Sequence, residues 1–208
     1  MKESPILFSA PMVRALLAGT KTQTRRIFKP DRMTWDANGR YTTYAMRGGE
    51  LSTTGSGPFK PSSWLHYCPY GQPGDRLWVR ETFARIDGQT RPWIETDYQA
   101  TYTHGDRLGD TLGIKKRWTP SIHMPRHASR ITLEVTGVRV ERLQDISSDD
   151  ARAEGCPDKP IDDAEQASID LLAKLWYHDL WEQINGLDSW AANPWVWVVE
   201  FKAIEAKP

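Results

Sequence analysis

SAPMVRALLAGTKTQTRR, residues 9–26, predicts a short helix that stops abruptly and is followed by a strand. Ser9 is a residue type that caps helix N-termini, and the proline two positions later is tolerated in a first turn. An apolar stripe follows, and Gly19 ends the helix. The next residues are rich in threonine, as strands are. Residues 21–26 are therefore expected to lie across a helix-to-strand junction.

The geometry of this junction decides whether Lys21 and Thr24 can share a site. In a regular strand, positions 21 and 24 point to opposite faces of the sheet. Both side chains can meet only if Lys21 lies in the turn before the strand begins. The turn expected after Gly19 makes that arrangement possible.

Three further segments are expected to form strands. RLWVRETFA, residues 76–84, follows a Pro-Gly-Asp turn and alternates apolar with polar positions. ITLEVTGVRVERL, residues 131–143, alternates in the same way but changes phase at Gly137, which predicts a β-bulge. NPWVWVVEFKAI, residues 193–204, is typical of a buried strand that begins after a proline.

Two helices are expected between the last two of these strands. Ser147 or Ser148 can cap a short helix with an acidic first turn, and Gly155 ends it, so Glu154 is expected at a helix C-terminus. A longer helix is predicted from about residue 163 to residue 184, because apolar residues recur near a 3.6-residue period. Its aromatic stripe is interpreted as core.

Two long segments show no sustained periodicity and are interpreted as loop-rich insertions, at about residues 30–72 and 87–125. Loops of this length are usually functional or mobile. The whole chain, residues 1–208, is expected to form one α+β domain. Its predicted order is helix, strand, insertion, strand, insertion, strand, helix, helix, strand.

The charges balance, with 27 basic and 27 acidic residues, which argues against a generic polyanion-binding protein. They are nevertheless segregated along the chain. Residues 4–30 and 111–133 contain basic residues and no acid. These two segments could converge into one cationic cleft that attracts phosphate, or they could be two solvated surface strips.

The composition disfavours several classes of protein. The two cysteines, Cys68 and Cys156, cannot build a disulfide framework, and no paired spacing predicts a metal site. No apolar run approaches the roughly 20 residues of a membrane helix, and the N-terminus lacks the hydrophobic block of an export signal. A cytoplasmic protein with no metal, no cofactor, no membrane contact and no obligatory protein partner is therefore expected.

Four segments together resemble the activating signal cointegrator homology (ASCH) domain, in its larger, prophage-associated variety. They are SAPMVRALLAGTKTQTRR, then PGDRLWVRE, then ITLEVTGVRVERLQDIS with the adjoining SDDARAEG, and finally PWVWVVEFK. The GxKTxTxR junction is the most specific of these pieces. The resemblance implies a small PUA-like β-barrel flanked by helices, in a group whose members bind RNA.

A small bacterial branch of the ASCH family hydrolyses N4-acetylcytidine to cytidine and acetate, using a Lys, a Thr and a Glu. Those positions match Lys21, Thr24 and Glu154 here, the last through the order LQDIS and then ARAEG. The resemblance thus implies that Thr24 attacks the acyl carbonyl while Lys21, with a lowered pKa, acts as the base. Glu154 would shuttle a proton or orient the other groups.

Other residues are candidates for contacts with substrate or RNA. Arg26 could clamp a phosphate or stack on a base, and Arg25 could help to lower the pKa of Lys21. Glu81 could be a second acid in the cleft, although a pairing with Arg80 or Arg25 is the favoured role. Stacking and phosphate contacts typical of single-stranded RNA sites could come from Trp118, Arg126, Ser129 and Arg130.

Three functions are compatible with these residues. The first is a hydrolase that acts on N4-acetylcytidine or a similarly modified nucleoside. The second is a non-catalytic module that binds single-stranded RNA. The third is a metal-independent ribonuclease in which a base such as Lys21 activates the RNA 2′-hydroxyl. The insertions could cap the cleft around a nucleoside or extend it for a polymer.

Overall fold

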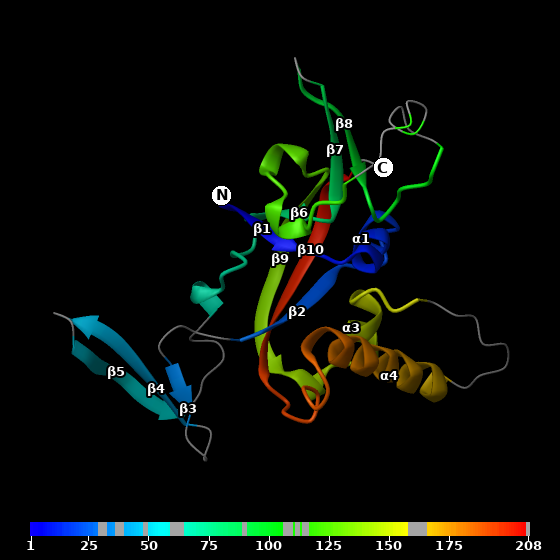
Figure 1. Cartoon of the computed structure of the whole chain (residues 1–208). Coiled ribbons are helices and arrows are strands. Elements are labelled where there is room, and N and C mark those ends of the chain that lie inside the picture. Colours follow the sequence, from blue (N-terminus) through cyan, green and yellow to red (C-terminus); the bar gives the residue numbers. More distant parts are fainter. Residues whose placement is uncertain are drawn as a thin grey trace.

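A five-stranded mixed sheet forms the body of the protein (Figure 1). The structure is a computed structural model and describes residues 1–28, 33–35, 40–47, 50–58, 65–88, 91–105, 110, 113, 117–157 and 166–206. The strand order is β1-β6-β9-β10-β2, with β1 and β6 parallel and the other neighbours antiparallel. Helices connect and cover these strands, so the α+β class expected from the sequence is confirmed.

Most strands and helices of this body follow the sequence pattern, but the first strand, Glu3–Leu7, was not expected, and the strand expected over residues 76–84 ends in this sheet at Arg80. The bulge predicted at Gly137 is present, because the pairing of β9 with β10 shifts register between Gly137 and Val135. The strands are β1 (Glu3–Leu7), β2 (Gln23–Ile27), β6 (Arg76–Arg80), β9 (Ile131–Arg142) and β10 (Trp195–Ala206), and the helices are α1 (Ala10–Leu17), α3 (Ser148–Ala153) and α4 (Gln166–Asn185).

β10 is buried on both faces, which explains its uninterrupted apolar sequence. Trp197, Val199 and Phe201 belong to a core that also contains apolar residues of α1. Val196 and Val198 belong to a second core, shared with α3 and α4. Packing on both faces thus holds β10 in place. The edge strand β2 pairs with β10 and is therefore also held in a fixed position.

The two edges of the sheet, β1 and β2, approach each other. The Arg26 side chain on β2 donates a hydrogen bond from Nη2 to the carbonyl oxygen of Leu7 on β1, at 2.6 Å. A single arginine side chain spans the gap, so the sheet must be strongly curled. Within the described ranges no strand ladder joins the two edges, so the expected barrel is not closed, and the Arg26 side chain bridges the gap between β1 and β2.

The two segments interpreted as insertions lie outside the five-stranded sheet, but they contain strands. An antiparallel sheet formed by β3 (Met33–Trp35), β4 (Arg40–Arg47) and β5 (Glu50–Pro58) stands apart from the body in Figure 1. β7 (Phe83–Gly88) and β8 (Arg91–Tyr98) form a two-stranded ribbon. Threonine, serine and glycine dominate β5, so hydrophobic alternation, the signal used for strands, is weak there.

Gly155 closes α3 against the end of α1. The helix begins as predicted, because the Ser147 side chain accepts a hydrogen bond from the backbone of Asp150. Gly155 then has φ of +97°, and a Cβ placed there would lie 3.0 Å from the Cβ of Ala15 and 3.4 Å from that of Lys21. Both the backbone angle and the close approach require glycine.

Replacement of Gly155 by alanine should lower stability more than the same change at Gly186. Both glycines have a similar positive φ, but an added Cβ at Gly186 meets nothing within 4 Å. Gly186→Ala therefore reports the cost of backbone strain, about 1–2 kcal/mol. Gly155→Ala adds the crowding against Ala15 and Lys21. Thermal melting of the two variants measures the difference, and equal melting temperatures would contradict the close packing.

Candidate functional site

Lys21 lies in the turn before β2, where the sequence required it to be. Its backbone forms an isolated antiparallel bridge with Glu154, the residue that caps the end of α3. The amide of Lys21 donates to the carbonyl of Ala15 on α1, and the next amide, of Thr22, donates to Ala153 on α3. The ends of two helices and the start of a strand therefore meet at this lysine.

Lys21 and Glu154 form a buried ion pair. The distance from Lys21 Nζ to Glu154 Oε2 is 2.7 Å, and Nζ also donates to the Glu154 carbonyl oxygen at 2.8 Å. Both residues are at most 3% exposed. Burial lowers the pKa of Lys21 below its ordinary value; the Glu154 carboxylate opposes this, and the positive charges of Arg26 and Arg25 add to it.

Arg25 sits at the centre of a network of carboxylates. It donates two hydrogen bonds to Glu141, one to Asp150 at 2.9 Å and a longer one to Glu154 at 3.3 Å. A second arginine, Arg139, bonds Glu141 and Asp150 from the other side. The positive charge of Arg25 is therefore already neutralised, and its guanidinium has little capacity left for a phosphate.

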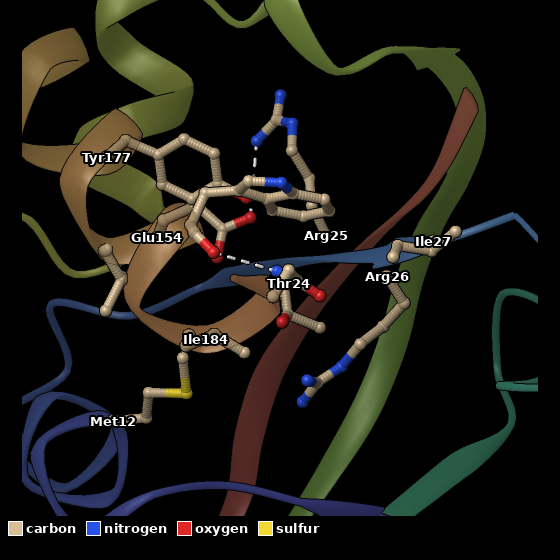
Figure 2. Close-up of a pocket in the computed structure, with 11 residues that line it drawn as sticks. Met12, Thr24, Arg25, Arg26, Ile27, Glu154, Tyr177 and Ile184 are labelled. Atoms are coloured by element: carbon tan, nitrogen blue, oxygen red, sulfur yellow. Dashed lines mark hydrogen bonds and ion pairs between the residues drawn. The ribbon is translucent and has the colours of Figure 1, made fainter. Parts of the chain in front are cut away.

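A cavity opens between β2 and α4, with Thr24 and Glu154 in its wall (Figure 2). Its volume open to the centres of water molecules is about 50 Å³, enough for a few waters or a small acyl group. Figure 2 shows Arg25 and Arg26 pointing away from each other. The lining residues are Met12, Thr24, Arg25, Arg26, Ile27, Glu154, Tyr177, Leu180, Trp181, Ile184 and Asn185.

Lys21 is not among the residues that line this cavity. Glu154 lies between Lys21 and the cavity, since one of its carboxylate oxygens contacts Lys21 and its side chain belongs to the cavity wall. Within the described ranges, no hydrogen bond joins Lys21 to the Thr24 hydroxyl. The structure thus brings Lys21 to Glu154, and Glu154 to the same cavity as Thr24.

Glu81 and Arg130 lie away from this cavity. They form a two-bond ion pair at 2.9 and 3.0 Å, with both residues at most 5% exposed. Their pairing follows from topology, because Glu81 comes just after β6 and Arg130 just before β9, which pairs antiparallel with β6. The partner of Glu81 is therefore Arg130 rather than Arg80 or Arg25, and the pair ties two central strands together.

The remaining residues expected to contact RNA have structural contacts elsewhere. Trp118 packs edge-on against Tyr102, with ring centroids 5.4 Å apart. Arg126 forms an exposed ion pair with Glu3 at 2.9 Å. The Ser129 hydroxyl donates to backbone carbonyl oxygens. None of these residues lines the cavity that holds Thr24.

A second, wider concavity of about 600 Å³ lies against β7. None of the described residues that line it is acidic, and several come from the acid-free segment 111–133. The two basic segments thus contribute to different cavities. The lining residues are Phe83, Arg85, Arg117, Thr119, His123, Pro125 and His127.

Tyr177 and Trp181 are aromatic residues of the cavity wall that the sequence did not assign to a site. They lie one turn apart on α4 and are at most 4% exposed. The apolar periodicity predicted Trp181 as core but did not include Tyr177, and about half of the surface of three leucine and isoleucine residues that it did include is exposed: Leu172, Leu175 and Ile184. Both Tyr177 and Trp181 line the cavity, and burial raises the pKa of Tyr177 well above its usual value. A stripe of aromatic residues signals burial but does not reveal which ring edges face a cavity.

Neither family models nor curated proteins give a match to this chain. Among solved structures it is similar to one described as the high-resolution crystal structure of an ASCH domain from Lactobacillus crispatus JV V101. The similarity covers 98% of this chain and 80% of that one, at 10% identity and a TM-score of 0.43. At this level it supports no statement about activity or ligand. ASCH is also the family that the sequence pattern resembles.

Two classes of site have no candidate in the part of the chain that the structure describes. No helix there is long and apolar enough to cross a membrane. No group of three or more His, Cys, Asp or Glu residues there could hold a metal ion.

Acid should weaken the network around Arg25 in a defined range. Burial opposes the charged form of Asp150, but Arg25 and Arg139 outweigh it and hold its pKa at about 2, below the ordinary 3.8. Because folding lowers the pKa of Asp150, its charged form stabilises the folded state at every pH above the pKa of the unfolded chain. This stabilisation is lost as the pH falls through the pKa of the folded protein. Unfolding experiments between about pH 5 and pH 2 should show the loss, and Asp150→Asn should reduce it.

Asp149→Asn is the matched control for Asp150→Asn. Asp149 is the neighbouring residue in the same helical turn, but its side chain is 92% exposed and pairs only with Arg152 among the described residues. The pH dependence of Asp149→Asn should stay close to that of the original protein. A similar change in both variants would show that the helix terminus, and not the Arg25 network, causes the acid sensitivity.

Proposed function

We propose that the protein is a hydrolase of an N4-acylated cytidine or a closely related modified nucleoside. The observation that carries this proposal is the shared cavity of Thr24 and Glu154, with Lys21 buried against the same carboxylate. A hydroxyl, a carboxylate and an amine whose pKa is lowered are the groups that acyl transfer requires. The ASCH resemblance of the GxKTxTxR junction adds the substrate class.

In this reaction the Thr24 hydroxyl oxygen attacks the acyl carbonyl carbon. Its proton passes to the Lys21–Glu154 pair, whose carboxylate belongs to the cavity wall. The C–N bond then breaks, the cytosine amine takes up the proton, and the acyl group remains on Thr24 as an ester. Water attacks the ester by the reverse proton route, which releases the carboxylate and restores the hydroxyl.

Lys21 accepts a proton only when it is neutral, so its pKa must lie below the ordinary value. Burial supplies that shift, and the nearby Arg26 and Arg25 contribute in the same direction. The bond to Glu154 opposes it and also holds the amine in place. The two residues therefore act as one unit in which a proton can be exchanged, and Thr24 is reached through Glu154.

Wild-type protein incubated with N4-acetylcytidine should release cytidine, measured by chromatography. Thr24→Val and Lys21→Ala should each lower the rate about a thousandfold or more, because each removes a group that acts in every turnover. Thr22→Ala is the matched control, since Thr22 lies two residues from Thr24 and is exposed. Release that survives Thr24→Val would exclude Thr24 as nucleophile, and no release by wild-type protein at high concentration would exclude the substrate.

Binding of single-stranded RNA is a second candidate function, favoured by the concavity against β7. Its lining combines Arg85, Arg117, His123 and His127 with the ring of Phe83. Arginine side chains along a concave surface are typical of sites that follow the backbone of a single strand without reading its sequence, although the Phe83 ring itself is buried beneath Arg85. This concavity is separate from the Thr24 cavity. RNA bound here could be a polymer substrate for the Thr24 site, or the protein could bind RNA without catalysing a reaction.

Arg117→Gln should weaken binding of a short single-stranded RNA, followed by fluorescence anisotropy. Loss of one phosphate contact should make the dependence of log affinity on log salt less steep by about 0.7. Lys174→Gln is the control of equal charge change, since Lys174 is exposed on α4 and does not line the concavity. Equal weakening by both variants would indicate nonspecific attraction rather than a site at the concavity.

A further inference from the structure

The indole N–H of Trp181 is a buried donor without an acceptor. Trp181 is 4% exposed and lines the cavity that contains Thr24 and Glu154. Its Nε1 has no hydrogen-bond partner among the described residues. Buried polar groups in proteins are nearly always hydrogen-bonded, so an unpaired one in a cavity wall indicates a place where a ligand supplies the missing acceptor.

The other nitrogen-bearing side chains of the cavity wall, Arg25, Arg26 and Asn185, each donate to an acceptor within the protein. Arg25 donates to three carboxylates, and Arg26 donates to the carbonyl of Leu7. The amide of Asn185 donates to the Trp181 carbonyl oxygen at 3.1 Å. Among the described side chains that line this cavity, Trp181 Nε1 is therefore the buried nitrogen that has no acceptor.

We propose that Trp181 Nε1–H binds the acyl carbonyl oxygen of the substrate and stabilises the oxyanion formed when Thr24 attacks. This inference rests on the proposed function, and it supplies the oxyanion donor that acyl transfer requires. The indole is a neutral donor that does not titrate, so its action is independent of pH. It also limits the substrate to molecules whose acyl oxygen can enter the cavity beside Thr24.

The packing of α4 holds this donor in a fixed position. Trp181 belongs to the core formed with α3 and β10, and the ring of Tyr177 lies 6.3 Å from it. Donors that are already oriented stabilise developing charge more than donors that must reorganise. The role of Trp181 is thus binding of the reacting oxygen, on a helix that the core keeps rigid.

Trp181→Phe removes the N–H and keeps an aromatic ring. With N4-acetylcytidine, kcat should fall about 100- to 1,000-fold while KM changes much less, because the bond strengthens in the transition state. Trp176→Phe is the matched control, since Trp176 lies on the same helix and packs against the same core but does not line the cavity. If the wild-type protein hydrolyses the substrate and Trp181→Phe does so at the same rate, the inference is overturned while the proposed function stands.

An NMR titration separates this inference from the proposed reaction. The indole N–H signal of Trp181 is assigned by its absence from Trp181→Phe, and N4-acetylcytidine is added to the Thr24→Val variant, in which hydrolysis is blocked. A downfield shift of the Trp181 signal, with the Trp176 signal unmoved, supports the donor role even if wild-type protein shows no turnover. A Trp181 signal that stays in place at saturating nucleoside overturns it.

Discussion

The buried ion pair between Lys21 and Glu154 is the contact on which the rest of the site depends. It joins the turn after α1 to the end of α3, two segments 133 residues apart. Two charges at this depth are tolerated only because they meet each other, and loss of one partner leaves the other buried without compensation. Gly155 permits the close approach, since any side chain there would press against Ala15 and Lys21. Both the stability of the fold and the proposed chemistry therefore require Lys21 and Glu154 to be held in contact at this junction.

Arg25 explains how an acid-free basic segment coexists with a net charge of zero. The acids that balance it, Glu141, Asp150 and Glu154, come from the acid-rich region after β9 begins. The segment 4–30 is thus neutralised at this point by long-range pairing and does not present its full charge to solvent. A cationic cleft made by both basic segments would require free guanidinium groups here, whereas the structure commits Arg25 to orienting Glu154.

The sequence correctly predicted the features that depend on residues close together in the chain, such as caps, helix ends, turns and bulges. The cap at Ser147, the end of α3 at Gly155, the bulge at Gly137 and the position of Lys21 before β2 all depend on residues close in the chain. Partners distant in sequence were harder to predict. The pairing of Glu81 with Arg130 depends on the register of β6 against β9, and the place of Trp181 in the cavity depends on how α4 packs. The strands β3–β5 were not predicted, because their backbone ladders do not require alternating apolar residues.

The size of the Thr24 cavity bears on how a nucleoside could be oriented. A volume of about 50 Å³ open to water centres suits an acetyl group better than a whole nucleoside. Under the proposed chemistry the acyl end enters first, toward Thr24 and Trp181, and the base remains at the mouth of the cavity. Specificity would then reside in the acyl group, set by the rigid wall of α4. Recognition of the base would be left to the mouth of the cavity, where a free nucleoside and a nucleotide within a single strand present the same edge.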